Sequence, residues 1–283
     1  MTVLKTRFAY GTIMLAFFFG ILYMDNRLGT DIFLGLLTLF VGCIGLLEFY
    51  KMAKSDDIAP FKLTGLICGC IIFLNIWFSA RSKQADPLYL LNSGTLVILV
   101  FLTLFIQGFR YGIPNAIKNM SVTIFGVIFV FFLLSFSMLL YHSPAGNGLY
   151  DFLFVVLVSK VADIGGYLFG RKIGKRKLSP NISPKKSVEG LICGLLLSVI
   201  VAWALSLCTG KWITPWQWLT PFALVVSFSG VLGDLAESLL KRSANVKDSG
   251  GYIPTFGGVL DVIDSLLVSM PVAYYFLIFT AAR

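Results

Sequence analysis

Residues 230–265 read GVLGDLAESLLKRSANVKDSGGYIPTFGGVLDVIDS, and this stretch is polar in a chain that is otherwise dominated by apolar runs. Five carboxylates and three cations fall within its 36 residues. The apolar runs that it connects, 216–233 and 258–280, are each long enough to cross a membrane as a helix. The stretch therefore predicts a charged connection between two membrane-spanning helices.

The polar residues of this stretch recur at helical spacing. Two helices that each carry carboxylates on one stripe, joined by a glycine-rich connection with cations, suit a divalent metal ion and phosphate groups. A solvated charged face is the alternative for the first helix, whereas acids at the mouth of a membrane span are costly and usually functional. The first stripe holds Asp234, Glu237, Ser238, Lys241 and Asn245, and the second holds Asp261, Asp264 and Ser265.

The composition places the whole chain in the membrane. Of 283 residues, 57% are hydrophobic and only 13% are charged, which indicates a polytopic membrane protein. We expect an all-α fold, a polytopic integral membrane helical bundle of about nine transmembrane helices. The predicted spans lie near 8–24, 31–49, 62–80, 93–109, 119–141, 149–170, 188–208, 216–233 and 258–280.

The basic residues predict the orientation of these spans. With a cytoplasmic N-terminus, 17 of the 23 lysines and arginines fall in segments on the cytoplasmic side, as the positive-inside rule requires. The net charge of +9 therefore reflects membrane orientation, and we expect no nucleic-acid partner. The same arrangement places both polar segments, 171–187 and 234–257, on the cytoplasmic side.

The two halves of the chain differ in chemistry. We interpret residues 1–150 as an N-terminal transmembrane scaffold and residues 151–283 as the C-terminal transmembrane catalytic part of a single membrane domain. The acids of the first part, Glu48 among them, are interpreted as lying in or beside loops with little chemistry. The five cysteines lie in or at the ends of apolar runs, which indicates small hydrophobic residues and neither a disulfide framework nor a metal site.

A second polar region begins in the sixth predicted span. Lys160 and Asp163 lie three residues apart, and they either neutralise each other or bind substrate. Gly166 and Gly170 favour close helix packing. Residues 170–190 then carry seven cations before Glu189. This cluster is either a topology signal that contacts anionic lipids or a proline-stiffened loop that holds a polyphosphate.

Both polar regions resemble the phosphatidate cytidylyltransferase (CDP-diacylglycerol synthase) family. The first resembles its S-x-x-K-R-x4-K-D and P-x-H-G-G-x-x-D-R-x-D signature, although Phe256 stands at the usual His and Val262 at the usual Arg. The second resembles a further block of the same family, so that the likeness covers about 159–265. The matching residues are Ser238, Lys241, Arg242, Lys247, Asp248, Pro254, Gly257, Gly258, Asp261 and Asp264, and then Asp163, Gly165, Tyr167, Gly170, Lys177, Pro180, Ser183, Pro184, Lys185, Lys186, Glu189 and Gly190.

The resemblance implies a CTP-dependent nucleotidyltransferase that converts CTP and phosphatidic acid into CDP-diacylglycerol and pyrophosphate. It implies Mg2+, with a second cation as an option, and Asp234 and Asp261 as metal ligands. Membrane lipids are expected partners, a homodimer is an open alternative, and the expected location is the cell (inner) membrane, multi-pass, with the active site facing the cytoplasm. Expected catalytic residues are Lys241, Arg242, Lys247, Asp248 and Asp264; expected substrate-binding residues are Asp163, Lys177, Ser183, Lys185, Lys186, Glu189, Gly257 and Gly258.

Two alternatives to this function are open. One is a related CTP-dependent enzyme for another membrane lipid, such as a polyprenol kinase or an ether-lipid cytidylyltransferase. The other is an ion-coupled transporter, whose intramembrane acids relay cations. His142 is the only histidine, and it falls in a predicted external loop. We therefore expect a mechanism without a cytoplasmic imidazole.

Overall fold

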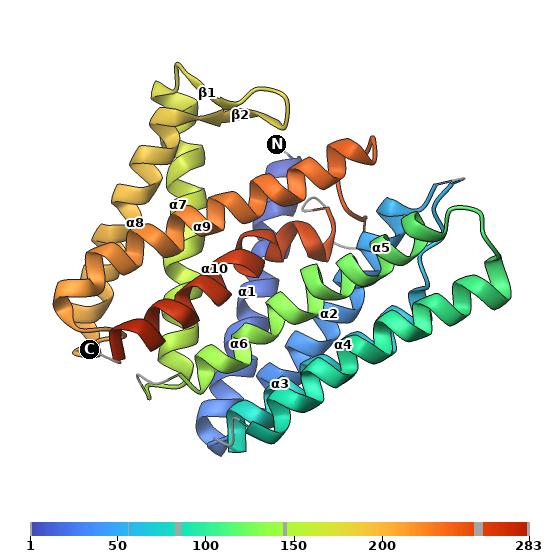
Figure 1. Cartoon of the computed structure of the whole chain (residues 1–283). Coiled ribbons are helices and arrows are strands. Elements are labelled where there is room, and N and C mark those ends of the chain that lie inside the picture. The colour runs from blue at the N-terminus through green and yellow to red at the C-terminus, as the bar shows by residue number, and fades with distance from the viewer. Residues whose placement is uncertain (1, 56, 83–85, 144–145, 252–256, 282–283) are drawn as a thin grey trace. The chain divides into compact units, whose positions relative to one another are not determined.

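The structure, a computed structural model, describes residues 2–55, 57–82, 86–143, 146–251 and 257–281 (Figure 1). These residues form helices and one short β-hairpin, which confirms the predicted all-α bundle. The elements are α1 (Thr2–Leu28), α2 (Ile32–Ala53), α3 (Lys62–Ser82), α4 (Asp86–Ile106), the π-helix η1 (Gln107–Tyr111), α5 (Ala116–Gly126), the π-helix η2 (Val127–Phe132), α6 (Leu133–Tyr141), α7 (Leu149–Ile173), β1 (Lys177–Ser179), β2 (Ser183–Ser187), α8 (Val188–Thr209), α9 (Trp216–Ser243) and α10 (Val259–Ala281).

Eight helical segments in the described part of the chain are long and apolar enough to cross a membrane. They coincide with the second to the ninth predicted spans. The first predicted span, 8–24, lies on α1, which is not among these eight, so it stays a prediction. The segments are Ile32–Ala53, Lys62–Ser82, Gly94–Tyr111, Ala116–Tyr141, Leu149–Ile173, Val188–Thr209, Trp216–Ser243 and Val259–Ala281.

The chain divides into two compact units. Unit 1 comprises Met1–Met138 and Val246–Val262, and unit 2 comprises Leu139–Asn245 and Ile263–Arg283. The second segment of unit 1 holds part of the polar signature, so that these residues pack with the N-terminal helices. The predicted functional division into 1–150 and 151–283 stays a prediction.

Unit 1 is held together by buried polar anchors as well as by apolar packing. The indole Nε1 of Trp77 donates to Asp31 Oδ2 at 2.6 Å, and the hydroxyl of Tyr50 donates to the carbonyl of Thr123 at 2.7 Å. Asp25 is fully buried and accepts the backbone N–H groups of Phe33 and Leu34 at the start of α2. These hydrogen bonds give the buried polar groups the partners that water would otherwise provide, and the membrane interior contains no water to do so.

Unit 2 is built on the close approach of α7 and α8. A Cβ added to Gly190 would lie 2.9 Å from Gly170 Cα, and one added to Gly194 would lie 3.0 Å from Gly166 N. Glycine is therefore required at these positions for space. Gly166 and Gly170 are the α7 residues that these two glycines approach, as the prediction of close helix packing requires.

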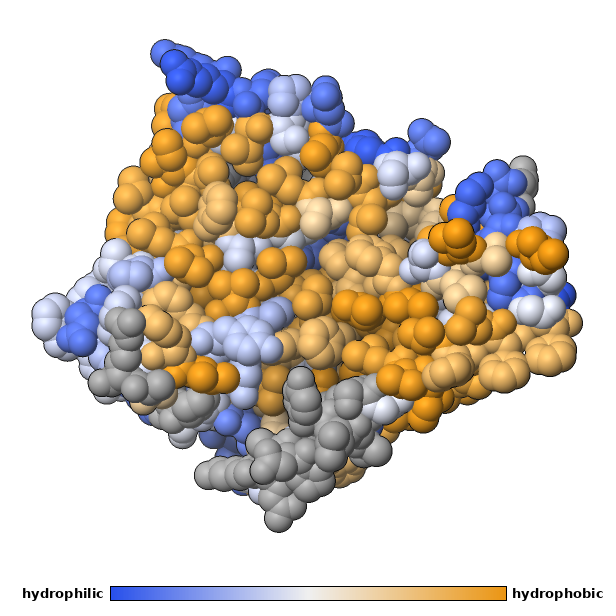
Figure 2. Space-filling model, viewed as in Figure 1, coloured by the Kyte–Doolittle hydropathy of each residue, from blue (hydrophilic) through white to orange (hydrophobic). Residues whose placement is uncertain are grey.

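The basic segment between α7 and α8 is a hairpin, whereas the sequence predicted a loop. Strand β1 pairs antiparallel with β2 in the register Lys177↔Ser187 and Ser179↔Ser183. The hydroxyl of Ser187 accepts the N–H of Gly190 at 3.2 Å and caps α8. The surface of the hairpin is hydrophilic, and the surface of the helices next to it is largely hydrophobic (Figure 2).

Candidate active site

A cavity of about 240 Å3 lies in unit 2 between the hairpin, α7, the start of α8 and α9. Five predicted site residues line it, although they come from segments up to 71 positions apart in the sequence. Lysines from the hairpin thus face carboxylates from α7 and α9. The lining residues used below are Asp163, Ser183, Lys185, Lys186 and Asp234.

Two lysines and three aspartates form the charged cluster of unit 2. Lys186 Nζ lies 2.6 Å from Asp234 Oδ2. Lys160 Nζ donates to the Ser265 hydroxyl at 2.7 Å and lies 3.7 Å from Asp264 and 4.0 Å from Asp163. Lys160 thus pairs with Asp264 as well as with Asp163. The cluster thus brings three carboxyl groups and two amino groups together, and Lys185 lines the cavity beside them.

The predicted residues of α9 occupy different surroundings. Ser238 donates to Asp234 Oδ1 at 3.3 Å. Lys241 pairs with Glu237, which is fully buried, and it is not among the residues that line the cavity. Arg242 Nε lies 3.5 Å from the carbonyl of Ile182 in the turn of the hairpin. Arg242 therefore connects α9 directly to the hairpin.

Glu189 holds the base of the hairpin. Its carboxylate accepts the backbone N–H groups of Lys175 and Arg176 at 2.9 and 3.1 Å. Lys177 on β1 is exposed. These contacts give Glu189 a local structural role, and its predicted contact with substrate stays a prediction.

Asp261 organises the start of α10 in unit 1. Its Oδ2 accepts three hydrogen bonds, from the Ser249 N–H at 3.0 Å, the Ser249 hydroxyl at 2.8 Å and the Gly258 N–H at 2.7 Å. Gly257 has φ +96°, a conformation that favours glycine. Lys247 and Asp248 are exposed in the connection that precedes Ser249.

Some of the predicted site residues belong to different units, and others lie outside the described residues. Asp234 belongs to unit 2 and Asp261 to unit 1, so their pairing as metal ligands stays a prediction. Pro254 and Phe256, two positions of the signature, lie outside the described residues. Val262, the second departure from the signature, lies in the first turn of α10.

The donor chemistry of these residues fits magnesium. Mg2+ prefers oxygen ligands and is commonly held by one or two carboxylates together with substrate phosphates and waters. Among the described residues, no group of three or more His, Cys, Asp or Glu is arranged to hold a metal ion. The carboxylates thus suit a metal that arrives with phosphate better than a metal held in an all-protein cage.

Glu48 is a residue that sequence reasoning missed. It is fully buried in α2 rather than in or beside a loop, and its carboxylate accepts the N–H groups of Val259 and Leu260 at 3.0 and 2.8 Å. The available signal was an acid at the end of an apolar run, since ionisable residues there are usually functional.

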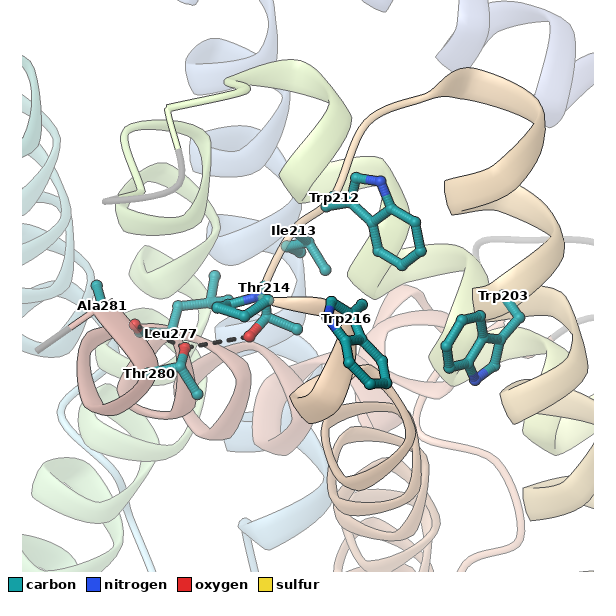
Figure 3. Close-up of a pocket in the computed structure, with 9 residues that line it drawn as sticks. Trp203, Trp212, Ile213, Thr214, Trp216, Leu277, Thr280 and Ala281 are labelled. Carbon is teal, nitrogen blue, oxygen red and sulfur yellow. Dashed lines mark hydrogen bonds between the residues drawn. The ribbon is translucent and has the colours of Figure 1, made fainter. Parts of the chain in front are cut away.

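A larger cavity of about 770 Å3 lies elsewhere in unit 2 (Figure 3). Three tryptophans and a hydrogen-bonded threonine pair, Thr214 and Thr280, line it. This cavity lies toward the C-terminal end of α8, whereas the hairpin joins its N-terminal end. Because α8 has 22 residues, the helix is about 33 Å long. None of the predicted site residues lines this cavity, and tryptophans at span ends are typical of an interfacial aromatic belt.

Comparison with known proteins defines the class of this chain. The profile of the "Cytidylyltransferase family" matches residues 5–280. The chain is 29% identical over 282 residues to "Phosphatidate cytidylyltransferase" of Chlamydia pneumoniae, covering 96% of this chain and 91% of that protein. It is 33% identical over 244 residues to the protein of the same name in Staphylococcus aureus (strain COL), covering 86% and 90%. The chain therefore belongs to the cytidylyltransferase family.

Proposed function

We propose that this chain is a phosphatidate cytidylyltransferase, which converts CTP and phosphatidic acid into CDP-diacylglycerol and pyrophosphate. The observation that carries the proposal is the meeting of hairpin lysines with carboxylates in one cavity of unit 2, in a chain whose relatives have this name. Family membership favours this function over an ion-coupled transporter. The names of the relatives favour it over a polyprenol kinase.

The reaction exchanges one phosphoanhydride bond for another. An oxygen of the lipid phosphate forms a bond to the α-phosphorus of CTP, and the bond from that phosphorus to the bridging oxygen breaks, so that pyrophosphate leaves with the electron pair. The second pKa of a phosphomonoester is about 6, which makes the attacking group largely dianionic at neutral pH. The reaction therefore needs no protein nucleophile and no general base.

The charges of the chain support this role. We assign Lys185 and Lys186 to the triphosphate, where they neutralise charge on the departing pyrophosphate. Ser183, Lys177, Asp163, Glu189, Gly257 and Gly258 are proposed to complete the binding of substrate. Lys241, Arg242 and Lys247 are proposed to bind phosphate oxygens.

The cofactor that we propose is Mg2+, with Asp234 and Asp261 as ligands and Asp248 and Asp264 as further ligands or their partners. When bound, the ion neutralises phosphate charge and orients the triphosphate. Lys186 lies beside Asp234, so that a phosphate group in the cavity meets an ammonium group already held in place. This pre-ordering lowers the entropic cost of binding.

We further propose that the protein is a multi-pass protein of the cell membrane and that its site faces the cytoplasm, where CTP is made. The distribution of lysine and arginine supports this orientation. Phosphatidic acid would reach the site from the surrounding membrane, since the helices next to the hairpin present hydrophobic surface (Figure 2).

Purified protein in detergent tests the proposal. With CTP, phosphatidic acid and Mg2+, we expect pyrophosphate release that depends on the added lipid and that stops when the metal is chelated. Diacylglycerol, which lacks the attacking phosphate, is the matched control and should give no release. Pyrophosphate release without phosphatidic acid, or no release with it, would contradict the proposal.

A further inference from the structure

Glu48 is a buried carboxylate from the predicted scaffold that binds the polar signature. It has no exposed surface, and its two oxygens accept the N–H groups of Val259 and Leu260, the first two residues of α10. Its Oε2 also lies 3.4 Å from the hydroxyl of Ser249. All of these residues belong to unit 1.

The groups around Glu48 offset the free-energy cost of burying its carboxylate. The first N–H groups of a helix have no partner within the helix, and the positive end of the helix dipole favours an anion. Glu48 supplies this anion from α2, a helix more than 200 positions away in the sequence. Its carboxylate thereby fixes where α10 begins.

The same contacts connect Glu48 to Asp261. The Ser249 hydroxyl lies between the two carboxylates, 2.8 Å from Asp261 Oδ2 and 3.4 Å from Glu48 Oε2. Glu48 also holds Leu260, the residue that precedes Asp261. The position of the Asp261 carboxylate therefore depends on Glu48 through one side chain and one stretch of backbone.

Two glycines of the signature region are explained by this carboxylate. A Cβ added to Gly250 would meet the Glu48 carboxylate, with Cδ at 2.8 Å, and one added to Gly258 would lie 2.5 Å from Glu48 Oε2. Neither glycine has a positive φ. These positions therefore need glycine for space and not for backbone conformation.

We propose that Glu48 is a positioning residue for cytidylyl transfer, one that holds Ser249 and the start of α10 so that Asp261 can bind a divalent cation together with nucleotide. This inference rests on the proposed function, and it assigns to the N-terminal part of the chain a direct role in preparing the site. Glu48 contacts Ser249, Val259 and Leu260, and it acts on Asp261 through these residues.

Asp25 provides a matched control within the same unit. It too is fully buried, and it too accepts two backbone N–H groups at the start of a helix, those of Phe33 and Leu34. Asp25 lies on α1 and binds the start of α2, and its hydrogen bonds go to Thr30, Phe33 and Leu34 rather than to the signature. Asp25→Asn therefore removes the same chemistry as Glu48→Gln without touching Asp261.

The first experiment compares Glu48→Gln with Asp25→Asn as purified, monodisperse proteins. Turnover is measured with CTP and phosphatidic acid, and the affinity for Mn2+ is measured by electron paramagnetic resonance with CTP and no lipid. We expect Glu48→Gln to lower turnover at least tenfold and to weaken Mn2+ binding at least fivefold. Asp25→Asn should change both by less than twofold per folded molecule.

A double-mutant cycle tests the same inference independently of Glu48→Gln. Gly250→Ala should reduce activity at least fivefold when Glu48 is present, because the methyl group displaces the carboxylate. In a Glu48→Ala background the same change should cause less than a twofold further loss, since the space is then open. Equal effects of Gly250→Ala in the two backgrounds would overturn the inference.

The outcomes separate this inference from the proposed function. Absence of lipid-dependent transfer in the unmodified protein, with Mn2+ binding that Glu48→Gln weakens, would contradict the proposed function and support the role of Glu48. Mn2+ affinity unchanged by Glu48→Gln, or changed equally by Asp25→Asn, would overturn the role of Glu48. Failure of the unmodified protein to bind Mn2+ would overturn it as well.

Discussion

At the scale of single residues, two aspartates with the same proposed role have different surroundings. Asp234 faces the cavity of unit 2, with Lys186 on one oxygen and Ser238 on the other. Asp261 Oδ2 accepts three hydrogen bonds in unit 1. Replacing Asp261 would therefore disturb local structure as well as charge, which makes Asp234 the cleaner residue for a test of metal binding.

We predict that Asp234→Asn lowers turnover at least 100-fold, or about 2.7 kcal/mol of transition-state stabilisation. The amide keeps the shape of the side chain but removes the charge that holds a divalent ion. Steady-state kinetics across a magnesium titration measures the effect. Lys54→Gln, at an exposed residue that follows α2, serves as a control with little expected change. Near-normal turnover of Asp234→Asn at low magnesium would remove Asp234 from the metal site.

The only histidine should be dispensable. His142 follows the end of α6 and packs against the Tyr141 ring at 5.1 Å. It precedes α7, and Asp163 lies 14 residues beyond the first residue of that helix, which is about 21 Å along its axis. A general base must lie within hydrogen-bond reach of the attacking oxygen. We therefore predict that His142→Ala keeps at least half of the turnover in the same assay. Loss of activity in folded His142→Ala would contradict a mechanism without a base.

Sequence reasoning predicted shared helix faces better than it predicted contacts between distant residues. Helical spacing predicted that Asp234, Glu237 and Lys241 share a face, and the structure adds that Lys241 pairs with Glu237. Helical spacing could not predict that Glu48 would bind Val259, because that contact joins residues 211 positions apart. Local spacing carries no information on such contacts, whereas the cost of a buried charge does indicate that a partner exists.

At the scale of elements, the α7–α8 pair positions the hairpin. The two helices approach through glycines, and the hairpin is the connection between them, held at its base by Glu189 and capped by Ser187. Lys186, which lies beside Asp234, is thus carried on a hairpin that α7 and α8 hold at both ends. A change that separates the helices should therefore disturb the cavity.

We predict that Gly194→Ala lowers the free energy of unfolding by about 1–3 kcal/mol. The added Cβ would meet the carbonyl of Ala162 and lie 3.0 Å from Gly166 N, so the helices must separate. Thermal unfolding in detergent measures the change. Gly20→Ala is the matched control, because nothing lies within 4 Å of its added Cβ and alanine favours a helix. An equal melting temperature for Gly194→Ala and the unmodified protein would contradict this account of the packing.

The sequence predicted the helices more accurately than the hairpin. Eight apolar runs stand out because the membrane requires both length and hydrophobicity, and each has a helical counterpart. Residues 177–187 carry three lysines and two prolines, and both residue types are depleted in strands. Glu189 accepts an N–H group of the backbone that precedes β1, 13 positions away in the sequence, and thereby stabilises the base of the hairpin. Such tertiary contacts override local propensity.

At the scale of the whole molecule, the distribution of charge predicts one functional side of the membrane. We expect segments 171–187 and 234–257 both to face the cytoplasm. With the native cysteines replaced, Lys172→Cys and Ala244→Cys should be protected from an impermeant thiol reagent in intact cells and should react after permeabilisation. Lys211→Cys, in a predicted external segment, should react in intact cells. Labelling of either cytoplasmic position from outside would contradict a shared site.

The transfer of label from CTP tests the central claim most directly. Purified protein is supplied with phosphatidic acid, Mg2+ and CTP labelled at either the α- or the γ-phosphorus. Cytidylyl transfer predicts that the α-label enters the lipid product, that the γ-label leaves in pyrophosphate, and that the two products form in equal amounts. Appearance of the γ-label in the lipid, as a kinase would give, or of neither label, would contradict the account.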